Sequence, residues 1–169
     1  MRVGIAGYGL AGRVFHGPLL KGCGYHVASI LTSNPDRIAQ AKSDFPEAQI
    51  FSELDAFLDS GLDLVVIASS NVAHLPQTLA ALELEIPTVV DKPMGRTLSE
   101  TQSIIDVSKS TGVAVTTYFN RKFDSDALTI KKIIKEGVFG NIFRLESRFE
   151  RFREIINPES WRENQNASE

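Results

Sequence analysis

The stretch Gly7-Tyr8-Gly9-Leu10-Ala11-Gly12 decides the fold of this chain. It directly follows the apolar run from Arg2 to Ala6, whose length and composition are typical of a buried strand. A helical pattern comes next and continues to about Lys21. The three glycines therefore stand in a turn that joins a predicted strand to a predicted helix.

The spacing of these glycines has a physical meaning. Gly7 allows a tight turn out of the strand, Gly9 lets the backbone approach a diphosphate, and Gly12 lets the helix pack closely on the sheet. The first N–H groups of the helix and the positive end of its dipole then face the phosphates. The context predicts a dinucleotide site over residues 7–12, and the alternative is a glycine-rich turn that holds no ligand.

Apolar runs alternate with helical patterns through the first 120 residues. Strands that alternate with helices pair in parallel, so this pattern predicts an α/β fold with a doubly wound parallel sheet of the Rossmann type. Helix N-caps are expected at Asn34 and Thr97. Further strands are expected at residues 25–31, 48–51, 62–68, 88–90 and 113–117. We expect residues 1–120 to form one dinucleotide-binding domain.

Residues 121–169 follow a different pattern. They predict an amphipathic helix at 124–136 and then a half-buried strand at 141–152, in which apolar and charged side chains alternate. No second strand follows, so we expect only the start of an incomplete α+β domain. A lone strand is unstable because its backbone groups stay unpaired, so it must pair with residues outside this chain or with another subunit. We therefore expect a homo-oligomer that assembles through the sheet of this second domain.

Composition excludes several classes of protein. The chain has 169 residues, with 43% hydrophobic and 23% charged residues and a net charge of −3, so a nucleic-acid partner is not expected. Cys23 is the only cysteine, so we expect no intramolecular disulfide and no metal site. The apolar runs have the length of strands and cannot span a membrane. A reducing, cytoplasmic location is expected.

The second predicted strand selects the cofactor. Sites for NAD usually place Asp or Glu about 20 residues after the glycines, where it binds the ribose hydroxyls. Thr32 occupies that position here, and Ser33 and Arg37 are suited to hold a 2′-phosphate. These residues favour NADP over NAD, and the alternative is that Arg37 is a solvated side chain in the first turn of a helix.

Two further polar groups follow predicted strands. Ser69, Ser70 and Asn71 come directly after the buried strand at 62–68, where ligands bind in open α/β sheets, and His74 lies one turn further on. These residues are expected to line the cofactor. The alternative is that Asn71 caps the helix and His74 is structural.

Asp91-Lys92-Pro93 follows the next strand. A lysine at this end of the strand points into the same crevice, where its charge can stabilise an alkoxide that forms during hydride transfer. Asp91 is placed to orient Lys92. On these residues alone the alternative is an ordinary loop.

The motifs together resemble the Gfo/Idh/MocA oxidoreductases, and most closely their NADP-dependent scyllo-inositol dehydrogenase-like subgroup. The resemblance covers almost the whole chain. It rests on GIAGYGLAGRVFH at 4–16, VVIASSNVAH at 65–74, VVDKPMGRTLSE at 89–100, YFNRKFDSD at 118–126, KEGVFGNIFRLESRFERFRE at 135–154 and Trp161-Arg162-Glu163. Most members have Glu where Asp91 stands, which fits a trait of the subgroup.

The resemblance implies an NAD(P)-dependent oxidoreductase that acts on the CH–OH group of a sugar- or inositol-like polyol. It implies that Lys92 is catalytic, that the regions of Asn71 and Asn120 line the cofactor, and that Trp161 and Arg162 approach the nicotinamide or the substrate. Asp91, next to Lys92, is also expected to lie near the cofactor. Family members are longer, and their proton-transferring histidine lies beyond the equivalent of residue 169. We therefore expect little or no turnover from these residues alone, and the alternative is a non-catalytic NADP-binding module or a relic.

Overall fold

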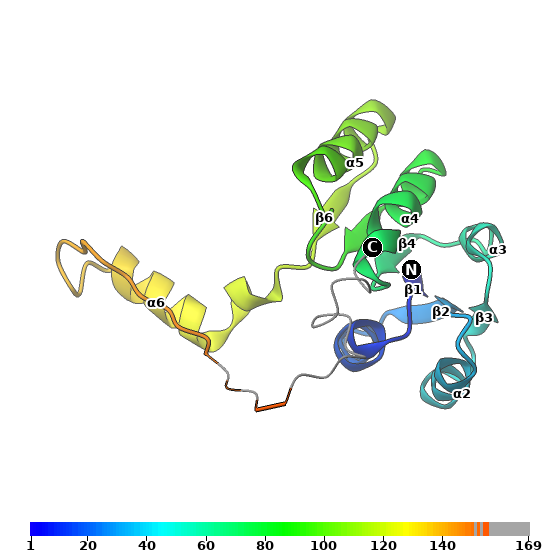
Figure 1. Cartoon of the computed structure of the whole chain (residues 1–169), viewed down its shortest axis with the longest axis horizontal. Coiled ribbons are helices and arrows are strands. Elements are labelled where there is room, and N and C mark those ends of the chain that lie inside the picture. Colours follow the sequence, from blue (N-terminus) through cyan, green and yellow to red (C-terminus); the bar gives the residue numbers. More distant parts are fainter. Residues whose placement is uncertain (151, 153, 156–169) are drawn as a thin grey trace. The chain divides into compact units, whose positions relative to one another are not determined.

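Six strands form one parallel sheet in the order β3-β2-β1-β4-β5-β6 (Figure 1). The computed structural model describes residues 1–150, 152, 154 and 155. The strand order reverses between β1 and β4, which places a topological switch point at their carboxyl ends. The strands are β1 (Arg2–Ala6), β2 (His26–Leu31), β3 (Gln49–Phe51), β4 (Leu64–Ile67), β5 (Thr88–Val90) and β6 (Val115–Thr117).

Helices connect the strands and cover both faces of the sheet. The connection from β1 to β2 begins as a π-helical segment and continues as an α-helix, and α4 and α5 lie side by side near β5 and β6 (Figure 1). The helical elements are η1 (Ala11–His16), α1 (Gly17–Gly22), α2 (Pro35–Asp44), α3 (Leu54–Leu58), α4 (Asn71–Glu83) and α5 (Leu98–Thr111).

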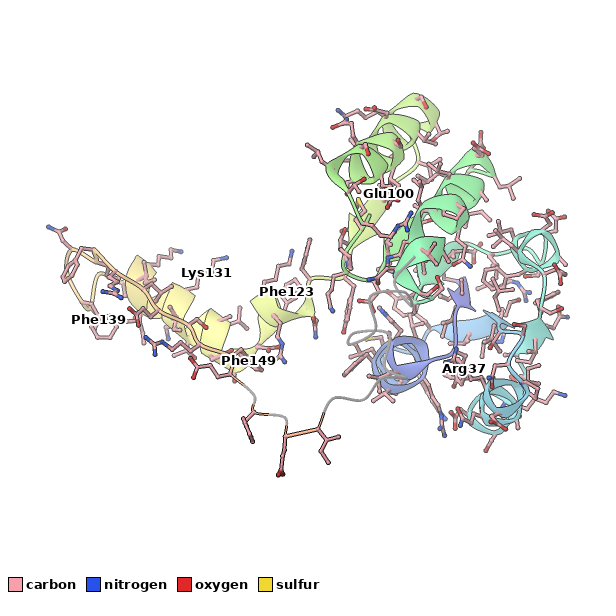
Figure 2. The ribbon with its side chains drawn as sticks, in the orientation of Figure 1. Arg37, Glu100, Phe123, Lys131, Phe139 and Phe149 are labelled. Atoms are coloured by element: carbon pink, nitrogen blue, oxygen red, sulfur yellow. The ribbon has the colours of Figure 1, made fainter. Side chains whose placement is uncertain are left out.

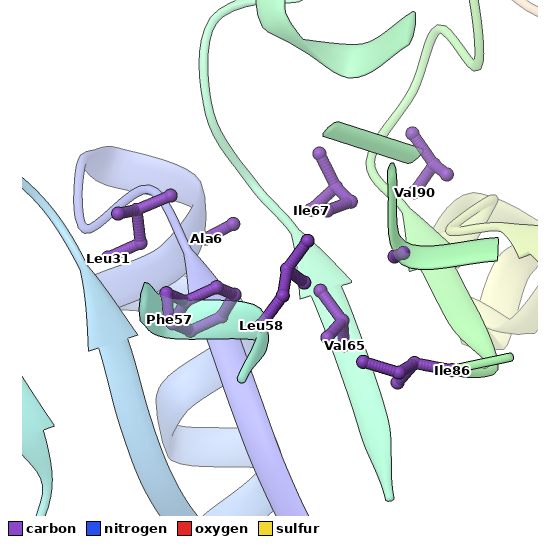
Figure 3. Packing of buried hydrophobic residues seen from close by; sticks show 9 residues of the cluster. Ala6, Leu31, Phe57, Leu58, Val65, Ile67, Ile86 and Val90 are labelled. Carbon is purple, nitrogen blue, oxygen red and sulfur yellow. The ribbon is translucent and has the colours of Figure 1, made fainter. Parts of the chain in front are cut away.

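Alternating side chains of the strands build two cores, one on each face. Ile5 in β1 and Val66 in β4 belong to a core that also contains Ala41 of α2. Their neighbours along the strands point the other way, into a core that contains Phe57 and Leu58 of α3 and Ala81 of α4. Figure 3 shows eight labelled members of this second core: Ala6, Leu31, Phe57, Leu58, Val65, Ile67, Ile86 and Val90. Because the strands are covered on both faces, they are apolar almost throughout.

The structure confirms the predicted doubly wound sheet and its six strands, several of which begin one or two residues later than expected. It also confirms two predicted caps: the side chain of Asn34 accepts the N–H of Arg37 at 3.1 Å, and Thr97 accepts the N–H of Glu100 at 3.2 Å. Each bond satisfies a backbone donor that the helix itself leaves unpaired.

The chain divides into two compact units, Met1–Tyr118 and Phe119–Glu169. The second contains a short 3-10 helix, η2 (Asn120–Phe123), and α6 (Ser125–Lys135), which lies within the helix predicted at 124–136. Asp124 is the N-cap residue of α6, and its carboxylate is paired with Arg121 at 2.7 Å. Figure 2 labels Lys131 on α6 and two of the phenylalanines that follow it, Phe139 and Phe149.

The predicted strand at 141–152 is wrong for the residues that the structure describes. Residues 141–150 form no strand, and Phe143 and Phe149 are 98% and 74% exposed. A strand needs a neighbour to take its backbone hydrogen bonds, and the described part of the second unit offers none. The alternation of apolar and charged side chains therefore has no layer on which to bury its apolar face.

Candidate functional site

The glycine turn leaves β1 at the switch point and lies directly against the loop after β4. Gly7 has a φ of +93°, and its N–H donates to the carbonyl of Leu31 at 2.9 Å. A Cβ atom at Gly7 would lie 2.5 Å from the Cα atom of Ser69. Only glycine fits this position, because any side chain would meet backbone and the φ is one that other residues rarely adopt.

Gly12 fixes how closely the first helix approaches the turn. A Cβ atom at Gly12 would overlap the carbonyl oxygen of Gly7, so the start of the helix folds back onto the turn. The first N–H groups of a helix have no partner within it, and here they lie beside a backbone without side chains at Gly9 and Gly12. This arrangement is suited to a diphosphate, which needs several N–H donors and close approach.

Arg37 lies beside Gly9. A Cβ atom at Gly9 would be 3.7 Å from the guanidinium carbon of Arg37, which is an ordinary contact distance. Arg37 comes from the first turn of α2 and is exposed, and it is labelled in Figure 2. Ser33 is exposed as well, whereas Thr32 is only 8% exposed. The structure therefore brings a cation to the edge of the glycine turn and places no carboxylate at position 32.

Tyr8 points away from solvent although it belongs to the turn. Its side chain is 1% exposed, and its hydroxyl donates to Asp44 at 3.0 Å. Arg13 donates to the same carboxylate oxygen at 2.8 Å and so lowers the pKa of the Asp44 carboxyl. Burial, helped by the bond to Asp44, raises the pKa of the Tyr8 hydroxyl. The Tyr8 side chain therefore anchors the turn to the end of α2, and its hydroxyl is already bonded within the protein.

The loop after β4 and the start of α4 carry the next group. Ser70 is the N-cap residue of α4 and Asn71 is its first residue, so the helix is not capped by Asn71. Ser69 donates its hydroxyl to the side chain of Gln77 at 2.7 Å. His74 is 1% exposed, and its two ring nitrogens lie 2.7 Å from the carbonyl oxygen of Pro93 and 3.3 Å from that of Ser69.

The Asp91-Lys92-Pro93 segment continues from β5 at the same edge of the sheet. Asp91 donates its N–H to the carbonyl of Ile67 at 2.8 Å, which extends the pairing of β5 with β4. Its carboxylate accepts the backbone N–H of Lys92 at 2.8 Å. Asp91 therefore orders the backbone at Lys92, whose side chain is exposed and makes no ion pair with the described residues. The Lys92–Pro93 peptide bond is cis.

His16 is a buried titratable residue that the sequence did not single out as part of the site. It is 4% exposed, its ring lies 4.4 Å from that of Tyr118, and Nε2 has no hydrogen-bond partner in the described part of the chain. Burial lowers its pKa, and the nearby charge of Asp91 partly opposes this shift. The sequence offered two signals for His16, its position near the start of the first helix and its place at the end of the motif at 4–16.

For three of the predicted site residues the structure does not show a position beside the glycine turn and the loops after β4 and β5. Asn120 begins η2 and belongs to the second unit. Trp161 and Arg162 lie outside the described residues. Their proximity to a cofactor or substrate stays a prediction.

No helix among the described residues is long and apolar enough to span a membrane.

Comparisons with known proteins identify relatives that match almost the whole chain. An oxidoreductase YdgJ of Escherichia coli, itself uncharacterised, is 40% identical over 165 residues, which are 96% of this chain and 46% of that protein. The scyllo-inositol 2-dehydrogenase (NADP(+)) IolW of Bacillus subtilis is 35% identical over 170 residues, 99% of this chain and 46% of that protein. The chain thus spans less than half the length of these two relatives.

A solved structure from Klebsiella pneumoniae matches with a TM-score of 0.84 at 32% identity, over 90% of this chain and 44% of that one. The family profile of Gfo/Idh/MocA, described as an oxidoreductase family with an NAD-binding Rossmann fold, matches residues 1–119. These are the residues that form the sheet, the glycine turn and the lysine segment. The chain therefore belongs to the Gfo/Idh/MocA oxidoreductase family, whose Rossmann fold binds NAD.

Proposed function

We propose that this chain is the NADP-binding part of an oxidoreductase that transfers hydride between the nicotinamide ring and a sugar- or inositol-like polyol. The observation that carries the proposal is the position of the Arg37 guanidinium, whose carbon lies 3.7 Å from the place that a Cβ of Gly9 would take. A guanidinium at this edge suits the 2′-phosphate that distinguishes NADP from NAD.

The residues present fit such a cofactor. Gly7 and Gly12 keep side chains out of a turn that presents N–H groups to a diphosphate. Ser33 and Arg37, which are both exposed, would bind the 2′-phosphate, and Thr32 brings no negative charge to repel it. Ser69, Ser70 and Asn71 would line the cofactor further along the same edge of the sheet.

Lys92 would carry the electrostatic part of the reaction. The nicotinamide ring of the bound cofactor supplies the hydride acceptor. The ammonium group of Lys92 would stabilise the negative charge that the substrate oxygen gains when its hydroxyl proton leaves and loses again as the hydride leaves the carbinol carbon and the C=O bond forms. Asp91 would hold the backbone at Lys92 through the bond from the Lys92 N–H.

The name of IolW supports both the cofactor and the substrate class, since that relative is named for NADP and for scyllo-inositol. None of the residues described here is placed as the acceptor of the hydroxyl proton. Loss of a general base costs typically about 10²–10⁴-fold in rate. We therefore propose that residues 1–169 alone turn over slowly or not at all.

The cofactor proposal is tested by calorimetric titration with NADPH and NADH. Arg37→Ala is expected to weaken NADPH about 10–100-fold, because a charge-assisted contact is lost, and to leave NADH within about threefold. Lys42→Ala is the matched control, since it removes the same charge from an exposed position in the last turn of the same helix, whereas Arg37 lies in the first turn. Equal loss of both cofactors, or loss in the control, would contradict the 2′-phosphate site.

A second candidate is a module that binds NADP without catalysis. It is favoured by the second unit, whose described residues form no sheet that could hold a substrate. An assay with NADP⁺ and scyllo-inositol, run beside a full-length relative such as IolW, separates the two. Comparable turnover would exclude the module and would also contradict the slow turnover proposed for residues 1–169. Weak but measurable turnover supports the oxidoreductase, and cofactor binding with no detectable turnover supports the module.

We also propose that the protein assembles as a homo-oligomer through the second unit and works in the cytoplasm. The exposed apolar side chains of Phe139, Phe143 and Phe149 support the first proposal, since large exposed apolar side chains mark interaction sites. The single exposed Cys23 supports a reducing compartment. Sedimentation equilibrium tests assembly, and a strictly monomeric mass at about 100 μM would contradict it.

A further inference from the structure

His74 lies between the two loops that follow β4 and β5. Nδ1 is 2.7 Å from the carbonyl oxygen of Pro93, and Nε2 is 3.3 Å from the carbonyl oxygen of Ser69. The side chain is 1% exposed and comes from α4, whose buried residues Thr78, Ala81 and Leu82 fix the helix on the sheet. The imidazole of His74 on helix α4 therefore contacts both loops.

The two contacts differ in strength. Both neighbours are carbonyl oxygens and can only accept, and a neutral imidazole has one N–H to give. The shorter distance, at Pro93, assigns that proton to Nδ1. Nε2 then carries no proton, so its 3.3 Å approach to the carbonyl oxygen of Ser69 is a packing contact and not a hydrogen bond. On the other side of Lys92, the carboxylate of Asp91 holds the Lys92 N–H. Lys92 is thus held on both sides, by Asp91 before it and by His74 after it.

The Ser69 contact connects this arrangement to the glycine turn. The backbone of Ser69 lies so close to Gly7 that a Cβ there would be 2.5 Å from the Cα of Ser69. His74 therefore contacts both the segment that carries Lys92 and the backbone against which the glycine turn rests.

We infer that His74 is a positioning residue for Lys92, acting through the carbonyl of Pro93, and is not itself a ligand of the cofactor. The role of Lys92 in this inference rests on the proposed function. The clamp, by which we mean the bonds of His74 to the Pro93 carbonyl and of the Lys92 N–H to Asp91, rests on the geometry alone. This role of His74 replaces the expectation from the sequence that His74 contacts the cofactor. Both ring nitrogens already face protein carbonyls, and the buried ring has no free polar edge to offer a ligand.

Two amide variants separate the contacts. The side-chain nitrogen of asparagine reaches the position of Nδ1, and that of glutamine reaches the position of Nε2. His74→Asn therefore keeps a donor for Pro93 and loses the contact with Ser69, whereas His74→Gln does the reverse. A residue that only fills space in the core would not distinguish the two amides in this order.

The test measures hydrogen exchange of the backbone at residues 91–96 and the affinity for NADPH in the 169-residue chain. His74→Gln is expected to raise exchange there about fivefold, the loss of one hydrogen bond, and His74→Asn to stay within about twofold of the wild type. Exchange in α2 is the internal control and should not change. In an assay with measurable turnover, His74→Gln should lower kcat by about fivefold at unchanged KM for NADP⁺, with kcat restored by His74→Asn.

Equal exchange in the two variants, or a rise throughout the first unit, would overturn the clamp. A tenfold or greater loss of NADPH affinity in both variants with unchanged exchange would identify His74 as a cofactor ligand instead. If the wild type itself binds no NADPH, the proposed function fails, and the exchange at residues 91–96 still decides whether His74 holds the segment.

Discussion

Single residues set the shape of the turn, and Gly12 does so under the tightest constraint. We predict that Gly12→Ala costs about 1–3 kcal/mol of stability, because its Cβ would overlap the Gly7 carbonyl, and weakens NADPH at least about tenfold. Gly22→Ala is the control, since nothing lies within 4 Å of a Cβ there. It should leave affinity unchanged and stability equal or slightly higher. Urea unfolding and calorimetry measure both, and a normal affinity in Gly12→Ala would count against the site.

The buried His16 is expected to make the stability of the folded chain depend on pH. Burial lowers its pKa below the ordinary value of 6.5, so below that pH the unfolded chain binds more protons than the folded one. Stability is therefore expected to fall as the pH drops from about 7.5 to about 5.5, and this fall should be smaller in His16→Gln. The exposed His26 offers the same substitution as a control. Thermal melts at both pH values test this prediction. If stability falls as much in His16→Gln as in the wild type, His16 is not the source of the pH dependence.

Site residues that directly follow a strand in sequence could be predicted. Contacts between residues far apart in sequence were harder to predict. The glycines, Arg37 and Lys92 follow strands at recognisable positions. The bond of Tyr8 to Asp44 joins residues 36 apart in sequence, and that of His74 to Pro93 joins residues 19 apart. No local pattern marks such pairs, because packing of α2 and α4 on the sheet creates them.

At the scale of elements, the N-cap of α2 positions Arg37 as well as stabilising the helix. Asn34→Ala should cost about 1 kcal/mol and reduce the preference for NADPH over NADH, because the capped turn carries Arg37. Thr97→Ala removes a comparable cap from α5 and should cost a similar amount without altering the cofactor preference. Denaturant midpoints and calorimetry test both variants. A similar change of preference in Thr97→Ala would show that the effect is global.

A predicted strand forms in the structure where neighbouring strands are present to take its backbone hydrogen bonds. Buried runs such as 62–68 have neighbours on both sides in the sheet, so their composition was enough to predict strands. The run at 141–152 has the pattern of a strand as well, but pattern specifies only which face is apolar. Formation requires a neighbour for the backbone, and the described residues contain none. Helix α6 needs no such partner, because its backbone bonds lie within the helix, and it forms as predicted.

For the molecule as a whole, both cores lie in the first unit. Every residue assigned to them falls between Val3 and Val115. A domain with its own core can fold alone, so we predict that residues 1–118 unfold in one cooperative transition and bind NADPH within about threefold of the full chain. Circular dichroism during heating and calorimetry test this. An unfolded or non-binding fragment would show that the second unit contributes to the site.

A crystal structure of the chain with bound NADP would show where the diphosphate lies. We predict diphosphate oxygens within about 3.2 Å of backbone N–H groups at the start of the first helix, with the 2′-phosphate against the guanidinium of Arg37. A cofactor bound elsewhere, or a turn at residues 7–12 that closes over the site and excludes it, would refute the proposed dinucleotide site.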